Sequence, residues 1–480
     1  MSVALLIDFG STYTKVAAVD LEQARFIGWA QAPSTVDTDV TQGLLRALKL
    51  LKDQTGLQDK QVSLRLACSS AAGGLRMVAV GLVGRLTAEA ANQAALGAGA
   101  RVVEVFERAL NPRSIRSLEA ANPDIILLAG GVNGGNREVI LHNAWQITAS
   151  RVKAPVVVAG NVEAQEEVCA LLQKAGRPAY RCPNVMPLLN VLDVEPARQV
   201  VREVFIRHIV RAKGLDRAKE YVGNVIMPTP MAVLQMTELL GQGVGQEPGM
   251  GATVVIDIGG ATTDVHSACW GTPTTNSMPM VGLPEPFAKR SVEGDLGLRV
   301  SATSLLEVAR KNSLPTELAR VLESTQAGLR TEYLSTNTSA LPHTEAEQEM
   351  DVAMASAAAY MAMGRHAGSL EFVDTPTGLE TVQRGKDLTE VKALLGTGGV
   401  FAFGARPEAV LEVSLFSTTN PFSLRPKHPD LYVDGNYTLY AAGLLATVYP
   451  EKALRLAMNS LRRLGTPASP TVSANEQRRD

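Results

Sequence analysis

Short apolar runs that end at glycine recur along the chain, and each run predicts a β-strand. Five of them stand out: Val3–Phe9, Asp124–Ala129, Pro155–Ala159, Thr253–Ile258 and Val391–Leu395. Between them lie alanine-rich stretches that predict helices, namely Thr87–Leu110, Val162–Ala175 and Glu195–Ala212. Strands that alternate with helices in this way are typical of parallel or mixed sheets with helices on both faces. The pattern therefore predicts an α/β fold.

One strand-and-turn pattern occurs twice, near the start of each half of the chain. The first copy is IDFGSTYTKVAAVD at residues 7–20, and the second is IDIGGATTDVHSA at residues 256–268. Both place an aspartate after an apolar strand, then glycine, then hydroxyl side chains, and then β-branched residues. The repeat predicts two facing lobes of related topology, residues 1–245 and 246–465. The tail that follows, residues 466–480, has almost no apolar content and is expected to be disordered.

The composition of the 480-residue chain narrows the classes of function. Apolar residues make up 46% and charged residues 20%, so the chain has enough hydrophobic content for large cores. The formal net charge of −2 gives no electrostatic basis for binding nucleic acid or an anionic membrane. No apolar run reaches the roughly 18 residues that indicate a membrane-spanning helix, and the N-terminal residues resemble a strand rather than a signal peptide. We therefore expect a cytoplasmic protein.

The cysteines and histidines show no metal-ligand pattern. Four cysteines, at positions 68, 169, 182 and 269, form no CxxC pair, and the six histidines form no HxxxH or HExxH pair. Disulfide frameworks, zinc ribbons and redox-active dithiols are therefore not expected. The polar segment Glu323–Glu349 is interrupted and is expected to form a surface excursion of the second lobe.

The first copy of the repeated pattern has the groups that a phosphate site needs. Asp8, at the end of a strand, suits a water-coordinated Mg²⁺ ion, which prefers oxygen ligands. Gly10 allows the backbone to approach closely, and the amides and hydroxyls of Ser11 and Thr12 can donate hydrogen bonds to phosphate oxygens. Lys15 can add a positive charge. Taken alone, the segment is equally compatible with an ordinary hairpin that carries a solvated aspartate.

The second copy strengthens the phosphate interpretation, because it repeats the same groups in the other half of the chain. Its residues are Asp257, Gly259, Gly260, Thr262, Thr263 and Asp264. Two such hairpins on facing lobes can hold the terminal phosphates of a nucleotide from both sides, and Asp8 and Asp257 can share the metal. Asp8, Asp257 and Asp264 are thus the candidate catalytic carboxylates.

A third glycine-rich turn follows the second copy, in Leu394–Phe401. Its glycines, Gly396, Gly398 and Gly399, allow a base or ribose to lie flat against the backbone, and the helix that follows favours phosphate at its N-terminus. The alternative is a βα turn that needs a positive φ. The segment has no GxxxxGK[ST] pattern, so a P-loop enzyme is not indicated. Residues 124–136, DIILLAGGVNGGN, also cluster glycines, and we interpret them as a structural strand and turn.

These motifs, in this order, resemble those of the superfamily of actin, sugar kinases and heat-shock chaperone ATPases. Asp8, Ser11, Thr12 and Lys15 match its phosphate 1 motif; Asp257, Gly259, Gly260, Thr262 and Asp264 match phosphate 2; Gly396, Gly398 and Gly399 match the adenosine turn. Pro230–Gly241 and Tyr437–Leu445 take the places of its two connecting motifs. The resemblance implies a two-lobed actin-like ATPase fold with duplicated mixed-sheet subdomains and a nucleotide cleft between them, with ATP and Mg²⁺ as ligands.

Within that superfamily the chain resembles the MutL family associated with glutamate mutase. The supporting segments are Cys68–Leu82, Leu127–Asn136, Val157–Asn161, Asn184–Arg198 and Arg290–Arg299. In the last of them, Arg290, Glu293 and Asp295 could face a ribose or close the lobes, or belong to an ordinary surface loop. The resemblance implies an adenosylcobalamin-dependent mutase subunit as partner, and a homodimer is compatible with it.

The function implied by this resemblance is that of an ATP-binding chaperone or reactivating factor with slow ATPase activity. The chain has no DxHxxG segment, the loop that supplies a histidine to cobalamin, so it is not expected to be the mutase itself. A small-molecule kinase on the same fold is the main alternative, since Asp257 could serve as its base. An activator with an iron–sulfur cluster between subunits and a module that only binds are further alternatives.

Overall fold

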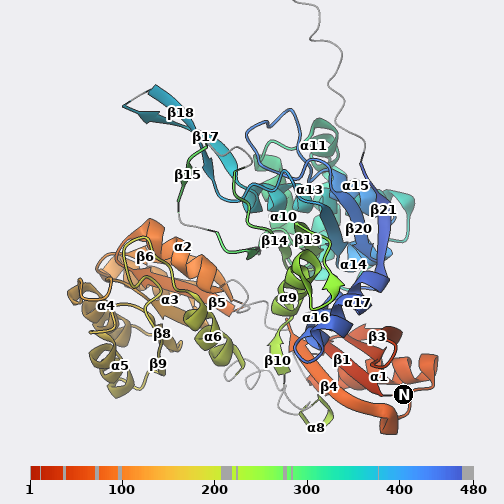
Figure 1. Cartoon of the computed structure of the whole chain (residues 1–480), viewed down its shortest axis with the longest axis horizontal. Helices are drawn as coiled ribbons and strands as arrows, with labels where there is room; N and C mark the ends of the chain where they lie inside the picture. The colour runs from red at the N-terminus through yellow and green to blue at the C-terminus, as the bar shows by residue number, and fades with distance from the viewer. Residues whose placement is uncertain are drawn as a thin grey trace, which may run out of the picture.

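The computed structural model describes residues 2–10, 12–35, 39–70, 75–95, 100–206, 219–222, 225–273, 278–282, 285–376 and 378–467. Three large sheets organise it: one in each of two related lobes, and one in a unit inserted into the first lobe (Figure 1). Candidate residue Ser11 and residues 468–480 of the predicted tail lie outside the described residues.

The sheet of the first lobe contains the first copy of the repeated pattern. Its five strands run in the order β10-β4-β1-β2-β3. Their bounds are β1 Val3–Phe9, β2 Tyr13–Asp20, β3 Arg25–Pro33, β4 Val62–Ser69 and β10 Val225–Pro228. β1, β2 and β3 are antiparallel neighbours, whereas β4 and β10 add parallel strands. Helix α1 (Val40–Thr55) packs on this sheet; it starts at Asp39, whose side chain caps it, and ends at the left-handed Gly56.

The sheet of the second lobe repeats that order. Its strands run β16-β14-β13-β19-β20-β21. Their bounds are β13 Thr253–Ile258, β14 Thr263–Ala268, β16 Ala288–Glu293, β19 Ala393–Thr397, β20 Asp430–Asp434 and β21 Leu461–Gly465. In both lobes the third strand pairs with the second, the second with the first, and the first with a parallel fourth. This shared topology confirms the predicted α/β fold with duplicated mixed sheets.

The helices of the second lobe cover its sheet and join it to the first lobe. They are α10 Ala302–Lys311, α11 Thr316–Leu322, α12 Thr325–Thr336, α13 Glu345–His366, α14 Gly399–Phe403, α15 Pro407–Glu412, α16 Leu439–Ala446 and α17 Pro450–Ser460. α16 packs against α9 (Thr229–Gln242), and one apolar core runs from β1 through these two helices to β13 and β19. α9 and α16 lie where the two connecting motifs are predicted. Because their shared core contacts strands of both sheets, these two helices form the apolar contact, or joint, between the lobes.

Shorter elements complete the two lobes. They are the 3₁₀ turn η1 Asp59–Gln61, α8 Lys219–Val222, the hairpin β11 Gly243–Val244 with β12 Glu247–Pro248, and a small sheet of β15 Met280–Val281, β17 Ser369–Thr375 and β18 Gly378–Arg384. No helix in the described part of the chain is long and apolar enough to cross a membrane.

The inserted unit is a doubly wound parallel sheet with its own apolar core. Its strands, in the order β6-β5-β7-β8-β9, are all parallel. The elements are β5 Leu75–Gly81, α2 Gly84–Ala95, β6 Ala100–Glu107, α3 Pro112–Ala121, β7 Ile125–Leu128, α4 Glu138–Ala149, β8 Val156–Val158, α5 Gln165–Lys174, β9 Ala179–Arg181 and α6 Glu195–Val204. The unit lies beside the two lobes (Figure 1).

This unit corrects one predicted element. The helix expected over Thr87–Leu110 is wrong in its second half, where β6 lies. The segment Arg101–Glu107 reads RVVEVFE, and its β-branched and aromatic residues favour a strand. The boundary between the two lobes at residues 245 and 246 stays a prediction.

Candidate functional site

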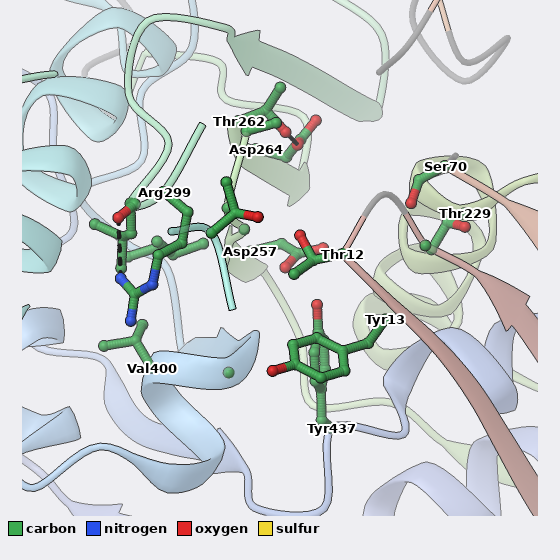
Figure 2. Close-up of a pocket in the computed structure, with 18 of the residues that line it drawn as sticks. Thr12, Tyr13, Ser70, Thr229, Asp257, Thr262, Asp264, Arg299, Val400 and Tyr437 are labelled. Carbon is green, nitrogen blue, oxygen red and sulfur yellow. Dashed lines mark hydrogen bonds between the residues drawn. The ribbon is translucent and has the colours of Figure 1, made fainter. Parts of the chain in front are cut away.

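The two glycine hairpins face each other across a cavity of about 700 Å³ that both lobes line. This volume is in the range of small-molecule sites. A Cβ atom built on Gly260 would lie 3.2 Å from Thr12 Oγ1, so the second hairpin touches the first. In Figure 2, Thr12 and Asp257 point into the space between the hairpins, with Thr262 and Asp264 beside them. The structure thus brings together two segments that are far apart in the sequence.

Local pairing explains why both hairpins have the same shape. In each one the glycine after the strand donates its N–H to a carbonyl three residues on: Gly10 to Tyr13 at 3.1 Å, and Gly259 to Thr262 at 2.9 Å. The register then places Asp8 opposite Lys15 in the first hairpin and, in the second, one aspartate opposite another. The same backbone turn therefore presents different charges in the two lobes.

Asp8 lies in a closed hydrogen-bond network rather than facing the cavity freely. Its carboxylate is fully buried; Oδ2 accepts from Lys15 Nζ at 2.8 Å, and Oδ1 accepts from Thr229 Oγ1 at 2.5 Å. Thr229 is the first residue of α9, so this bond ties the hairpin to the joint between the lobes. Cys68 on β4 lies 3.7 Å from the same carboxylate, and burial together with that charge raises the pKa of its thiol.

Lys15 keeps its charge in this buried place because several groups stabilise it. Burial by itself would lower the pKa of Lys15, but Asp8 and two tyrosines outweigh that effect and raise it. The ammonium lies 3.7 Å from the centroid of the Tyr437 ring and 5.2 Å from that of Tyr440. Tyr437 also lines the cavity, and burial raises the pKa of its hydroxyl to about 12.

Asp257 is the accessible carboxylate of the site. Within the described residues it has no hydrogen-bonded or ion-paired partner, and it is only partly buried. Burial and the negative charge of Asp264 raise its pKa to about 7, and the charge of Asp8 adds to the effect while Lys15 opposes it. At neutral pH this group is poised between its charged and neutral forms. The Asp257 carboxylate could therefore accept a proton, or it could bind a cation that neutralises its negative charge.

Asp264, in contrast, is fixed by its neighbours. Its Oδ1 accepts from Arg290 Nε at 2.8 Å and lies 2.6 Å from Arg290 Nη2, while Thr262 Oγ1 donates to Oδ2 at 2.9 Å. These bonds hold Asp264 and Thr262 at the wall of the cavity. The neighbouring Thr263 points away and donates to the carbonyl of Leu296 at 2.7 Å, which makes it a structural residue.

The three glycines of the predicted adenosine turn differ in what surrounds them: two are tightly packed and one lines the cavity. A Cβ at Gly396 would collide with the ring of Phe401, and one at Gly398 would collide with the carbonyl of Ile258. Gly398 also has φ +108°, which disfavours side chains. Gly399 has no atom within 4 Å of that position and lines the cavity. Of the three, Gly399 is the one that lines the cavity.

Several cavity residues were not among the candidates from the sequence. They include Thr338–Pro342 and Gln348, within the segment that was expected to be a surface excursion, and also Arg101, Thr229, Arg299 and Tyr437. Trp29 of the first lobe and Phe403 of the second, whose ring centroids are 5.8 Å apart, meet across the cavity. Residues 338–342 read TSALP and stand within the polar segment Glu323–Glu349, whose composition indicates a surface equally well as a cleft wall, so the sequence offered no means of choosing.

Glu293 and Asp295 lie away from this cavity. Both pair with Arg365 of α13, at 2.5 Å and 2.9 Å, and they line a second cavity, also of about 700 Å³, between β16 and the inserted unit. Burial would raise the pKa of Asp295, but Arg365 and, more weakly, Arg101 lower it. Glu293, the last residue of β16, pairs with Thr263 of the second hairpin, so the structure places this strand beside the hairpin, but neither carboxylate lines the cavity between the hairpins.

The residues of the cleft fit a water-coordinated Mg²⁺ better than a fully protein-bound ion. Among the described residues no group of three or more His, Cys, Asp or Glu side chains is arranged to hold a metal. Mg²⁺ commonly keeps several waters and uses one or two carboxylates with substrate phosphates. Asp257 has oxygens free for this purpose, whereas both oxygens of Asp8 already accept hydrogen bonds.

Comparison with known proteins gives a match along nearly the whole chain. Residues 4–461 match a protein family described as "MutL protein". The Protein MutL of Clostridium tetanomorphum is 45% identical over 458 residues, which cover 95% of this chain and 98% of that protein.

Similar solved structures are much more distant. The match to a glycerol dehydratase reactivase covers 93% of this chain and 99% of the reactivase chain, at 11% identity and a TM-score of 0.34. The match to a carbohydrate kinase from Novosphingobium aromaticivorans covers 97% of this chain and 95% of the kinase chain, at 15% identity and a TM-score of 0.33. At these TM-scores neither structure bears on the details of the cleft.

Proposed function

The chain belongs to the MutL protein family, and from this premise we propose that it is an ATP-binding accessory factor, with slow ATPase activity, for an adenosylcobalamin-dependent mutase. One observation carries the nucleotide part of the proposal. Two hairpins from different lobes, each with a strand-end aspartate, meet at Thr12 and Gly260 on one cavity of suitable size. The mutase is the partner that the resemblance to this family implies.

The hairpins would bind the terminal phosphates through their backbone N–H groups and hydroxyls. Thr12 and Thr262 are on the cavity wall, and Gly259 and Gly260 allow phosphate oxygens to approach the backbone. A bound Mg²⁺ would lie beside Asp257 and would neutralise phosphate charge. The base would lie against Gly399 and Val400, on the far side of the cavity from the first hairpin.

Hydrolysis needs a group that holds or accepts the proton of the attacking water. Asp257 suits this role, because its carboxylate lines the cavity and can accept a hydrogen bond from a water molecule there. Its partial burial, its position at the end of β13 and its lack of a competing partner within the described residues keep it available. Asp264, held by Arg290, would instead keep Thr262 in place.

The energy of nucleotide binding would reach the partner through the angle between the lobes. A triphosphate can contact both hairpins at once, whereas a diphosphate loses the terminal contacts. A ligand shifts a conformational equilibrium only by its differential affinity for the two states, so ATP and ADP would favour different lobe angles. A mutase bound to one lobe would then bind the two nucleotide forms with different affinity.

The same cleft also suits a small-molecule kinase, since a carboxyl group with a pKa near 7 is a plausible base for an acceptor hydroxyl. One experiment separates the two functions. The affinity for a purified adenosylcobalamin-dependent mutase is measured without nucleotide, with ADP, and with ATP in the Asp257→Ala variant. We expect at least two of the three affinities to differ. Equal affinities, together with rapid phosphorylation of a small acceptor, would contradict the accessory role and support the kinase.

A further inference from the structure

We propose that Arg101, which the inserted unit brings to the cleft, stabilises the terminal phosphoryl group of the nucleotide while that group is transferred to water. The proposal rests on the function proposed above and adds a residue from outside the two lobes. It also assigns the inserted unit a part in controlling the rate of hydrolysis.

Charge pairing singles out Arg101 among the cations of the cleft. Four cationic side chains of the described residues line the cavity: Lys15, Arg101, Arg290 and Arg299. Three of them are ion-paired, with Asp8 at 2.8 Å, Asp264 at 2.6 Å and Asp351 at 2.9 Å. Arg101 has no ion pair within the described part of the chain, and its Nε is buried there without a hydrogen-bond partner. Arg290 Nη1 is also buried without a hydrogen-bond partner, so the missing ion pair is what distinguishes Arg101. A guanidinium on the cavity wall that has no carboxylate partner can pair with an anionic ligand.

The position of Arg101 places it next to the second hairpin. Its guanidinium lies over Gly294, so close that a Cβ built on that glycine would collide with it. Ser301 Oγ lies 2.9 Å from the carbonyl of Gly294 and 2.8 Å from that of Ala261, in the hairpin turn. The Ser301 hydroxyl therefore connects Gly294, which lies against Arg101, to the turn of the second hairpin. Arginine at such a site suits phosphate, since its planar fork can donate two hydrogen bonds to phosphate oxygens.

Arg101 is part of the inserted unit, not of either lobe. It lies on β6, the edge strand of the parallel sheet, and it lines both the nucleotide cavity and the second cavity between this unit and β16. A change in the position of the inserted unit would therefore move Arg101 with respect to the hairpins. A partner bound to this unit could change the rate of hydrolysis without contacting the nucleotide.

The chemical step is the transfer of the γ-phosphoryl group of ATP to water. The oxygen of water forms a bond to the γ-phosphorus, and the bond from that phosphorus to the bridging oxygen breaks. The bridging oxygen leaves with the electron pair on ADP, and the proton released by water passes to solvent. Negative charge spreads over the terminal oxygens during this step. Arg101 donates hydrogen bonds to those oxygens, so its contribution is larger in the transition state than with bound ATP.

Arg101→Ala is the test variant, and Arg76→Ala is its control. Arg76 also belongs to the inserted unit and lines the second cavity, but not the nucleotide cavity. We expect Arg101→Ala to lower kcat for ATP hydrolysis by about 100-fold or more, as for other arginines that act on a terminal phosphoryl group. Affinity for ADP should change less than about threefold, while affinity for ADP with aluminium fluoride, which mimics the transferring group, should fall by a factor close to that in kcat. Arg76→Ala should match the parent in all three measurements.

The outcomes distinguish this proposal from the function on which it rests. If the parent protein binds no nucleotide, both are wrong. If the parent binds and hydrolyses ATP and Arg101→Ala does so at the same rate, only the role of Arg101 is wrong. An equal loss of affinity for ADP and for the aluminium fluoride complex would also overturn it, because Arg101 would then be a general cation of the cleft. Arg101→Lys, which keeps the charge but not the fork, is expected to recover only part of the rate.

Discussion

The two glycine hairpins have the same backbone turn but opposite electrostatic states. In the first, Asp8 is fully buried and both of its oxygens are bonded, to Lys15 and Thr229. In the second, Asp257 has no partner among the described residues and its pKa is raised to about 7. The same motif, an aspartate at the end of a strand followed by a glycine turn, therefore places its carboxylate in two different environments. The first carboxylate holds the structure of the cleft together, and the second is available for chemistry.

The reason for the difference lies in the strand that returns from each turn. The first hairpin returns through Lys15, directly opposite Asp8, so a cation neutralises the buried carboxylate. The second returns through Asp264, directly opposite Asp257. Arg290 pairs with Asp264 and leaves Asp257 uncompensated. A metal ion or a proton would supply the missing positive charge in the second hairpin, whereas Lys15 already supplies it in the first.

The largest expected effect that tests this contrast is on stability. Asp8→Ala would leave the buried ammonium of Lys15 without its partner, and breaking such a buried pair typically costs about 3–5 kcal/mol. Asp257→Ala removes a carboxylate that has no partner within the described residues, so we expect no loss of stability at pH 8. Denaturant unfolding of both variants measures the two free energies.

The double variant Asp8→Ala with Lys15→Met serves as the control for that experiment. It removes both charges, and we expect it to recover much of the stability that Asp8→Ala loses. If Asp8→Ala and Asp257→Ala destabilise the protein equally, the contrast between the two hairpins is wrong.

A smaller effect is expected in the pH dependence of stability. Between about pH 4 and pH 7 the folded protein holds the proton of Asp257 more tightly than the unfolded chain, because its pKa is raised to about 7. The contribution of this group to stability therefore falls as the pH rises through that window. Each pKa unit corresponds to about 1.4 kcal/mol. We expect Asp257→Asn to reduce the drop in unfolding free energy between pH 5 and pH 8 by on the order of 1–3 kcal/mol.

Unfolding curves of Asp257→Asn and the parent at several pH values check this prediction, with Asp264→Asn as a comparison. Parallel pH profiles for Asp257→Asn and the parent would show that Asp257 titrates normally. Adding Mg²⁺ with nucleotide should lower the pKa of Asp257 in the parent, and calorimetry in buffers with different ionisation enthalpies would detect the released protons.

The smallest expected effect compares the glycines of the two turns. A Cβ on Gly10 would collide with the backbone carbonyl of Tyr13, whereas the nearest atom for Gly259 is the carbonyl of Thr262 at 3.2 Å. Gly10→Ala should therefore cost about 1–2 kcal/mol, in the usual range for overpacking, and Gly259→Ala less than about 1 kcal/mol. Thermal unfolding of both variants measures the difference, and equal shifts would show that the two turns are equally tight.

The sequence alone determined the parts of this protein that depend on local pattern. Apolar runs that end at glycine predicted β1, β13 and β19 of the two lobes and β7 and β8 of the inserted unit. The repeated hairpins predicted the duplication, because period and turn chemistry act over a few residues. The helix predicted over Thr87–Leu110 was wrong because it was continued past a pair of glycines into β6. Gly97 and Gly99 stand before Arg101–Glu107, and they were the available signal that a helix ends and a strand begins.

Only the tertiary structure decided which of the matching residues are available to a ligand. The state of Asp8 depends on Thr229, more than 200 residues away in the sequence, and that of Lys15 on Tyr437. Arg101 reaches the cleft because a separate parallel sheet packs beside the two lobes, and residues 338–342 form a wall of the cleft although the segment around them has the polarity of a surface. The charge state of a carboxylate is set by burial and by the charges around it, and these come from segments that only the fold brings together.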